Sequence, residues 1–299
     1  MISVLIPVYD IDVRELVQEL YMQLSASGIA YEILLLDDGS IEETIACNTA
    51  CIISDNISFS NNDINRGRIY TRNKLAALAQ FSWLLFLDAD CKIVSENFIK
   101  DYLKSINDEV DVICGGTNYV SVIPENCRYK LHWRYANERV GINTVRQVGK
   151  KGFLFNNILI RKSFYQQLQF PENLNGYGHE DTWVGIQIDH LMAKIKDINN
   201  SVLHADLDTN DVFFQKQQSA LNNLKALATY TSEEILGRHV RIFRYYLYLR
   251  KTGLQSLFYR VIAIFERRIM ANLFGCNPSL FLFDLLRLKL FIKIMKNDK

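Results

Sequence analysis

The sequence predicts a doubly wound α/β fold, in which a mostly parallel central sheet has helices on both faces and a helical extension follows. Two observations lead to this prediction. Over the first hundred residues, short apolar strands alternate with amphipathic helices, which is typical of a parallel sheet covered on both faces. Beyond residue 216 the pattern is almost wholly helical. We therefore expect two parts, an α/β domain over 1–216 and a basic amphipathic helical extension over 217–299.

Local patterns justify the individual elements. Asp12 and Glu15 are spaced as a capping box that opens a helix, and Gly28 ends that helix. In chain order, we expect strands at 3–8, 31–36, 57–59 and 83–87 and helices at 12–28 and 66–80. Between about 110 and 205 the pattern loosens, with strands expected at 110–114 and 153–160 and a helix from Glu180. We expect this mixed region to complete a substrate site.

The composition is that of a packed globular protein. The 299 residues are 49% hydrophobic, and 34 Lys and Arg stand against 33 Asp and Glu. Disorder would need fewer apolar residues and a larger net charge, and a dedicated nucleic-acid binder would show a basic excess. Residues 1–216 hold 20 basic and 28 acidic side chains, whereas 217–299 hold 14 and 5. The two parts therefore carry net charges of −8 and +9, which suggests two different tasks.

Signals for export, membrane crossing and disulfides are weak. The first cationic side chain is Arg14, so no basic segment precedes the short apolar run at 4–6. No stretch reaches the ~18 uninterrupted apolar residues of a spanning helix. The six cysteines lack paired CxxC spacing, and we expect reduced thiols, mostly buried. These observations predict a cytoplasmic protein.

The strand at 83–87 ends in Asp88-Ala89-Asp90, two carboxylates one residue apart. Mn²⁺ and Mg²⁺ prefer oxygen ligands, and carboxylates together with a substrate diphosphate commonly form their shell. We interpret the pair as a candidate site for Mn²⁺ or Mg²⁺ with a diphosphate. The alternative is an ordinary junction of strand and loop, in which an aspartate caps a turn.

A second acidic segment, Asp37-Asp38-Gly39-Ser40, follows the strand at 31–36. The carboxyl ends of parallel strands share one edge of a sheet, where ligands gather. A carboxylate there can accept hydrogen bonds from a base or from ribose hydroxyls. The alternative is a β-turn with Asp and Gly in their preferred places. Neither GxGxxG nor GxxxxGK[ST] follows a strand, so the dinucleotide and P-loop interpretations lack their main feature.

The third motif is the segment from Asn175 to Trp183, which reads NGYGHEDTW. Its glycines flank an aromatic residue and predict a tight loop, and Glu180 and Asp181 then begin a helix whose dipole favours their charge. Either acid is a candidate general base for an acceptor hydroxyl, or both are ordinary first-turn helix acids. His204 is a candidate metal ligand, although a lone histidine is more often structural.

In order and spacing, these motifs resemble the family 2 glycosyltransferases with the GT-A fold, a Rossmann-like nucleotide-binding fold. The resemblance covers roughly residues 2–210. The Gly-Tyr-Gly-His-Glu-Asp stretch looks most like the version in galactosyl- and N-acetylgalactosaminyl-transferring members. The segments that carry the resemblance are 4–9, 37–40, Asn65-Arg66-Gly67, Arg72-Asn73, 86–90 and 176–181.

The resemblance implies a role for each candidate residue. It implies Asp90 as the surer metal ligand, with His204 completing the shell, and an acid of the pair Asp181 and Glu180 as the base. The donor nucleotide is expected to contact Pro7, Val8, Tyr9, Asp37, Asp38, Arg66, Arg72 and Asp88. The acceptor is expected to contact Tyr177, Gly178, His179 and Trp183.

The activity expected from this resemblance is transfer of a hexose or N-acetylhexosamine with inversion. The expected donor is a nucleotide diphosphate sugar of the UDP class, and the expected acceptor is a saccharide or lipid-linked saccharide of surface polysaccharide synthesis. Two alternatives are a catalytically silent nucleotide-sugar-binding scaffold and a haloacid-dehalogenase-like phosphatase. The phosphatase carries its first aspartate on the first strand of the core, whereas Asp88 follows at least three strands.

The extension allows two interpretations. Between residues 254 and 296, stripes of Leu, Phe and Ile are bordered by Arg and Lys. Such a surface can lie in an anionic membrane interface, which would place the protein on the inner face of the cell membrane. Alternatively, the stripes pack on the α/β domain or on a second subunit.

Overall fold

The computed structural model describes residues 1–141, 154–171, 174 and 177–296. It divides into two compact units. The first unit comprises residues 1–118, 154–169 and 190–205, and the second comprises 119–153, 170–189 and 206–299.

The first unit is built on a seven-stranded sheet with the order β3-β2-β1-β4-β8-β6-β9, and a three-stranded sheet has the order β5-β10-β7. Parallel pairing joins β1 to β2 and β4, β2 to β3, and β6 to β9, whereas β8 runs antiparallel to β4 and β6. The predicted mostly parallel α/β fold is confirmed. The strands are β1 (Ile2–Val8), β2 (Tyr31–Asp37), β3 (Ile57–Asn61), β4 (Trp83–Leu87), β5 (Cys91–Ile93), β6 (Val112–Cys114), β7 (Thr117–Tyr119), β8 (Asn157–Arg161), β9 (Ile195–Asp197) and β10 (Val202–His204).

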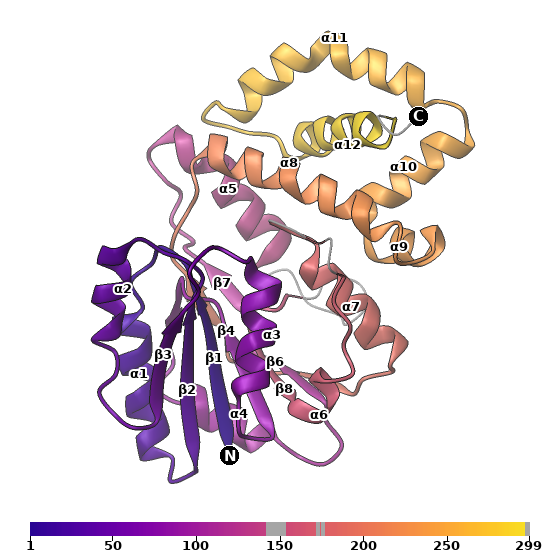
Figure 1. Ribbon diagram of the computed structural model, residues 1–299. Coiled ribbons are helices and arrows are strands. Elements are labelled where there is room, and N and C mark those ends of the chain that lie inside the picture. The colour runs from indigo at the N-terminus through magenta and orange to yellow at the C-terminus, as the bar shows by residue number, and fades with distance from the viewer. Residues whose placement is uncertain (142–153, 172–173, 175–176, 297–299) are drawn as a thin grey trace. The chain divides into compact units, whose positions relative to one another are not determined.

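Helices cover both faces of the large sheet (Figure 1). Alternate residues of β1, such as Val4 and Ile6, join a core with buried side chains of the helices α1 and α4. The helix α3 packs against β1 and β2 on the other face. Because both faces are covered, β1, β2 and β4 are apolar almost throughout. The helices of this unit are α1 (Arg14–Ala26), α2 (Glu42–Thr49), α3 (Arg68–Leu78), α4 (Phe98–Ser105) and α6 (Lys162–Tyr165).

The predicted capping box at Asp12 is wrong. Asp12 Oδ1 accepts a hydrogen bond from the Arg14 N–H at 3.0 Å, and both carboxylate oxygens contact the Arg14 side chain. The helix begins at Arg14, and its preceding residue makes no side-chain cap. The ion pair with Arg14 therefore replaces the reciprocal contact with Glu15 that the spacing predicted.

The second unit is helical. Its core joins side chains of α5, α8, α11 and α12, among them Leu131, Phe213, Ile269 and Phe283. The helices of this unit are α5 (Lys130–Tyr135), α7 (Glu180–His190), α8 (Asn210–Leu227), α9 (Glu233–His239), α10 (Arg241–Lys251), α11 (Gln255–Leu273) and α12 (Leu280–Lys296), with a 3₁₀ turn at Cys127–Tyr129 and a π-helical turn at Ala136–Val140. The predicted helical C-terminal region is confirmed.

The two stripes of the extension differ in their surroundings. In α12, Phe283, Leu286, Phe291 and Ile292 are buried, so most of this helix packs in the core. Of the predicted stripe, Leu288 and Ile292 are buried, whereas Phe281 is 68% exposed. In α11, Ile262 and Ile269 are buried, whereas other apolar side chains of the same helix are exposed. The predicted boundary at 216 falls inside α8, and the functional division into domain and extension stays a prediction.

One pair of cysteines contradicts the expectation of reduced thiols. Cys127 and Cys276 form a disulfide across 149 residues of sequence. Cys47, Cys51 and Cys91 are not in disulfides. The expectation failed because no spacing rule reveals a pair so far apart in the chain.

Within the part of the chain that the structure describes, no helix is both long enough and apolar enough to span a membrane.

Candidate functional site

The loops after β1 and β2 are tied together by Asp37, Ser40 and Asp10. Asp37 accepts hydrogen bonds from the N–H groups of Gly39 and Ser40 and from Ser40 Oγ, at 3.0, 2.8 and 2.6 Å. Ser40 Oγ in turn accepts from the Asp10 N–H at 2.7 Å, and Asp10 Oδ1 accepts from the Ile41 N–H at 3.1 Å. The Asp37 carboxylate thus stabilises the turn at residues 37–40.

Asp38 anchors the loop that precedes α3. Its carboxylate accepts from Asn62 Nδ2 and from the N–H groups of Arg66 and Gly67, at 2.9, 2.9 and 2.8 Å. Gly39 allows this approach, because a Cβ there would lie 2.7 Å from the backbone of residues 64 and 65. Three residues that we expect to contact the donor are Asp37, Asp38 and Arg66. The loops that carry them are therefore joined by hydrogen bonds.

The other predicted donor contacts of this edge differ in exposure. Tyr9 is 53% exposed, Pro7 is half-buried within β1, and Val8 is buried. The Val8 carbonyl accepts from the Asp38 N–H at 2.8 Å. The exposed Arg66 guanidinium lies 5.7 Å from the centre of the Tyr70 ring. Tyr9 and Arg66 thus present side chains to solvent, while Val8 contributes backbone.

Asp88 is held by two arginines of α3. Arg72 Nη2 lies 2.7 Å from Asp88 Oδ1, and Arg68 Nη1 lies 3.7 Å from Asp88 Oδ2. The Arg72 and Asp88 side chains are only 5% and 11% exposed, and the Arg72 guanidinium lies 4.9 Å from the centre of the Phe155 ring. Arg68 was not predicted as a site residue. Its spacing of four from Arg72, which puts both on one helix face, is the signal that could have found it.

Asp90 faces His204, which comes from β10. Because β10 pairs antiparallel with β5, His204 lies opposite Cys91, next to Asp90 in sequence. His204 Nε2 is 2.9 Å from Asp90 Oδ2, and the two side chains are 17% and 30% exposed. Burial raises the pKa of Asp90, but the hydrogen bond and charge of His204 outweigh burial, so this pKa lies below its ordinary value. The carboxylate is therefore ionised at neutral pH.

The donor set of this pair fits a divalent cation. Asp90 Oδ1 is buried and has no hydrogen-bond partner among the described residues. An ionised carboxylate and an imidazole are ligands that Mn²⁺ accepts. No group of three or more His, Cys, Asp or Glu side chains gathers as a metal site in the described ranges. A cation at Asp90 and His204 would therefore need further oxygen ligands, which a substrate diphosphate and water supply.

The loop before α7 packs on α8. Gly178 has a φ of 96°, and a Cβ there would lie 2.6 Å from Ala220 Cβ. Asn223 Nδ2 donates to the Gly178 carbonyl at 2.9 Å, and Lys216 Nζ lies 5.6 Å from the centre of the Tyr177 ring. These contacts explain the glycine at 178, while Asn175 and Gly176 of the same motif lie outside the described residues.

Replacing Gly178 by Ala should destabilise the protein, because the new methyl group meets α8. Overpacking of this kind costs about 1–3 kcal/mol. The control is Gly253→Ala, since Gly253 also has a positive φ, 71°, but nothing lies within 4 Å of its Cβ position. Urea unfolding should show the larger loss of stability for Gly178→Ala. Equal losses would mean that backbone strain alone explains both.

The predicted catalytic acids begin α7. Glu180 is buried and Asp181 is half-buried, both in the first turn of α7. His179 precedes them with a φ of 67°, and its carbonyl accepts from the Trp183 N–H at 3.0 Å. His179 Nδ1 and Thr182 Oγ1 are 3.0 Å apart, and the Trp183 ring meets the Tyr230 ring edge-on at 6.2 Å. The acids therefore sit at a helix N-terminus, where the dipole favours their charge.

Solved structures resemble the whole chain. A mannosyltransferase, PcManGT from Pyrobaculum calidifontis in complex with GDP-Man and Mn²⁺, matches with a TM-score of 0.58 at 11% identity, over 100% of this chain and 88% of that one. S. aureus TarS 1-349 matches with a TM-score of 0.51 at 17% identity, over 100% and 92%, and the same protein is also solved with UDP at the same score. At these identities the likeness concerns the fold, which is GT-A.

The sequence comparisons give the family. No curated protein matches this chain significantly. The family model described as glycosyl transferase family 2 matches residues 3–169, more than half of the chain. This range includes the loops at Asp37 and Asp38, the arginines of α3, and Asp88 and Asp90. The chain therefore belongs to glycosyl transferase family 2 and is a glycosyltransferase.

Proposed function

We propose that this glycosyltransferase is metal-dependent and inverting, and that it moves a hexose or N-acetylhexosamine from a UDP-sugar to a saccharide or lipid-linked saccharide hydroxyl. The observation that carries the proposal is the pairing of Asp90 with His204 beside Asp88 at the end of β4. A divalent cation needs oxygen ligands, and the ionised Asp90 carboxylate, whose side chain is 30% exposed, provides them.

The residues of the first unit would bind the donor. Tyr9 and Arg66 are exposed beside the loops that Asp37 and Asp38 shape, and Asp88 is kept in place by Arg68 and Arg72. Asp90 and His204 would hold Mn²⁺ or Mg²⁺, which when bound neutralises charge on the departing diphosphate. The two arginines leave Asp88 little freedom, so its neighbour Asp90 is presented in a defined geometry.

The residues of the second unit would act on the acceptor. Asp181 would remove the proton of the attacking hydroxyl, with Glu180 as the alternative base. The hydroxyl oxygen then forms the new bond to the anomeric carbon from the face opposite the nucleoside diphosphate, whose oxygen leaves with the bonding electrons. A single displacement of this kind inverts the anomeric configuration.

A panel of nucleotide sugars with Mn²⁺ tests this proposal most directly. Slow release of nucleoside diphosphate without acceptor, abolished by EDTA, is the expected result. The panel should contain UDP- and GDP-sugars, because similar folds have been solved with GDP-Man and with UDP. Release from GDP-sugars alone would overturn the UDP assignment. Release that EDTA leaves unchanged would overturn metal dependence, and tight binding with no turnover under any acceptor would favour a scaffold.

We further propose that α11 lies on an anionic membrane surface. Leu257, Val261 and Ile264 share one face of α11 and are 60%, 42% and 76% exposed, and Arg260 and Arg267 beside them are exposed as well. Each cation near an anionic surface contributes about 1 kcal/mol. This location at the inner face of the cell membrane suits synthesis of a surface polysaccharide on a lipid carrier.

Replacing Leu257 and Ile264 together by Glu should abolish binding to anionic vesicles, because charges replace the apolar contact with lipid. Co-sedimentation with phosphatidylglycerol vesicles at low salt measures this binding. The matched control changes Val122 and Ile123 to Glu, two side chains that are 74% and 59% exposed outside α11. Unmodified protein that stays in the supernatant would contradict the proposal.

A further inference from the structure

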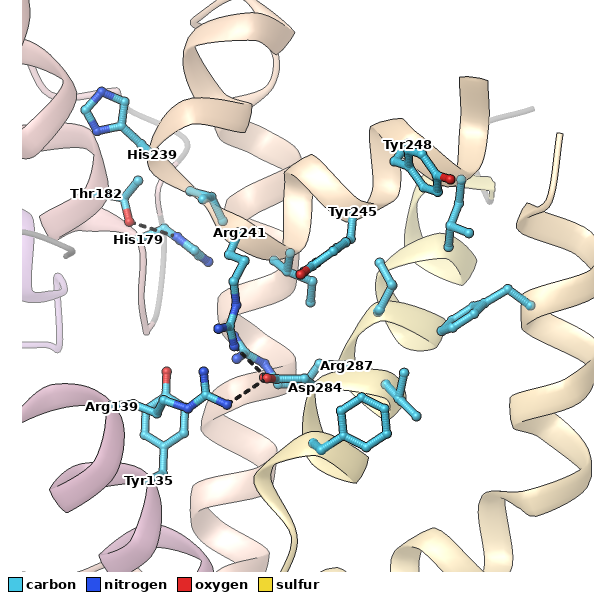
Figure 2. Close-up of a pocket in the computed structure, with 17 residues that line it drawn as sticks. Tyr135, Arg139, His179, Thr182, His239, Arg241, Tyr245, Tyr248, Asp284 and Arg287 are labelled. Atoms are coloured by element: carbon cyan, nitrogen blue, oxygen red, sulfur yellow. Dashed lines mark hydrogen bonds and ion pairs between the residues drawn. The ribbon is translucent and has the colours of Figure 1, made fainter. Parts of the chain in front are cut away.

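A cavity of about 630 Å³ lies within the second unit, among α5, α7, α10, α11 and α12. This volume is typical of small-molecule sites. Figure 2 shows arginines around Asp284 in one part of the cavity and the side chains of Tyr245 and Tyr248 in another. Its wall includes His179 and Thr182, which flank the acids Glu180 and Asp181 in the sequence. The cavity is therefore adjacent in the chain to the proposed catalytic base.

The charged side chains of this cavity do not balance. Arg139 Nη2 and Arg241 Nη2 share the Asp284 carboxylate, at 3.1 and 2.6 Å from Oδ2. Arg287 also lines the cavity. Three guanidinium groups and one carboxylate therefore line the cavity, which leaves a formal excess of two positive charges. An excess of this kind attracts an anionic ligand.

Arg287 is the strongest single indication of such a ligand. Its Nε is buried and has no hydrogen-bond partner among the described residues. Within the same ranges its guanidinium makes no ion pair, and it lies 5.4 Å from the centre of the Phe283 ring. The side chain as a whole is half-buried, its guanidinium keeps its charge in a protein, and a buried N–H donor without a partner is costly. A phosphate group offers two oxygens to the planar guanidinium, which binds them in a bidentate manner.

His179 does not add to the positive charge. Burial, and to a smaller extent the charge of Arg287, lowers the pKa of His179 to about 3. The imidazole is therefore neutral at physiological pH, and its contact with Thr182 Oγ1 at 3.0 Å orients it. A neutral ring can hydrogen-bond a sugar hydroxyl, which suits a position one residue before the proposed catalytic acids.

Another part of the cavity wall is apolar. Phe258, Phe281, Leu285 and Leu288 line it, from α11 and α12. Phe258 and Leu285 also pack against the core of the unit. An inorganic phosphate would leave this apolar wall unused, whereas an amphiphile would cover it.

We propose that this cavity binds the phosphate or diphosphate of a lipid-linked saccharide acceptor, with Arg287 on the anion and the first part of the lipid chain against the apolar wall. This inference rests on the proposed function, because the bound ligand is an acceptor only if the protein transfers sugar to it. The ligand class is an alkyl or isoprenoid phosphate that carries a sugar. The proposal extends acceptor binding beyond the motif of residues 177–183.

Equilibrium binding tests the cavity without any catalysis. The probes are geranyl diphosphate, geraniol and inorganic diphosphate, added to the full-length protein in EDTA and saturating UDP and followed by calorimetry. We expect geranyl diphosphate to bind at least about tenfold more tightly than inorganic diphosphate, because apolar contacts add to the anion. Equal affinities would show a free-phosphate site and overturn the lipid part. No binding of any probe would overturn the site.

Substitution of Arg287 assigns the binding to this cavity. Arg287→Gln should weaken geranyl diphosphate binding by about 10- to 100-fold, the effect of losing a charged hydrogen bond, and Arg287→Lys should recover part of the loss. The control is Arg238→Gln, because Arg238 is exposed on α9 and pairs only with Glu234 among the described residues. Unchanged affinity in Arg287→Gln would refute the proposal.

If Arg287→Gln does not fold, hydrogen exchange of the unmodified protein measures where geranyl diphosphate binds. Geranyl diphosphate should slow exchange in peptides of α10 and α12, which carry Arg241 and Arg287. Protection confined to other helices would overturn the assignment. None of these measurements needs sugar transfer, so failure of the donor panel and failure of the cavity are separate results.

Discussion

Replacing Asp181 by Asn should lower kcat by about 10²–10⁴-fold, the usual contribution of general base catalysis. The amide is close to the carboxylate in size, so the first turn of α7 should keep its structure, but it cannot take up the acceptor proton. Affinity for the nucleotide sugar should stay nearly unchanged, because the predicted donor contacts belong to the other compact unit. Steady-state kinetics with the identified donor and acceptor, together with UDP binding by calorimetry, measure both quantities.

Glu180→Gln is the matched control for this experiment. Glu180 precedes Asp181 in the same helical turn and is buried. If Glu180→Gln loses transfer and Asp181→Asn retains it, the base is Glu180. If both variants fold and transfer sugar at the parent rate, neither acid is the base. Circular dichroism and thermal melting establish that each variant is folded.

Replacing Asp90 by Asn should weaken Mn²⁺-dependent binding of UDP. The amide lacks the negative charge that a hard cation needs, and it leaves His204 without its carboxylate partner at 2.9 Å. We expect a loss of at least about 10- to 100-fold, the range that removal of a hydrogen-bond partner of a metal ligand already causes. Calorimetry with UDP, with and without Mn²⁺, measures the effect.

The control variant is Asp63→Asn, which removes an exposed carboxylate of the same unit. It should bind UDP as the unmodified protein does. The metal-independent part of UDP binding should be equal in Asp90→Asn and in the parent. If Asp90→Asn keeps the full effect of Mn²⁺, the metal is held elsewhere and the assignment of Asp90 and His204 is wrong.

The sheet could be predicted from the sequence because buried strands produce continuous apolar runs. β1, β2 and β4 are covered on both faces, so nearly every position is apolar, and the pattern can be read without knowing any neighbour. The motif at 88–90 was visible for the same reason, since a polar pair ends a buried strand. The different partners of its two carboxylates could not be predicted, because they come from distant segments. Asp88 contacts arginines of α3, and Asp90 contacts a histidine of β10.

Contacts between distant segments explain why the disulfide and the burial of the C-terminal helices could not be predicted. The disulfide joins Cys127 to Cys276, and no local pattern distinguishes those two cysteines from the other four. Stripes of similar appearance in α11 and α12 have different surroundings, because α12 contacts α8, α10 and α11 and α11 keeps one face exposed. Helical periodicity identifies an apolar face but not the surface that covers it.

The sequence alone determined the α/β class, the order of the motifs and the chemistry that their residue types allow, because these depend on neighbours in the chain. Tertiary structure decided which carboxylate is tied to arginine and which to histidine, that Arg287 lines a cavity with no acidic partner among the described residues, and how the two long helices of the basic extension differ in burial. These outcomes depend on which segments pack together, and the burial and charge around a side chain are set by residues far from it in the sequence.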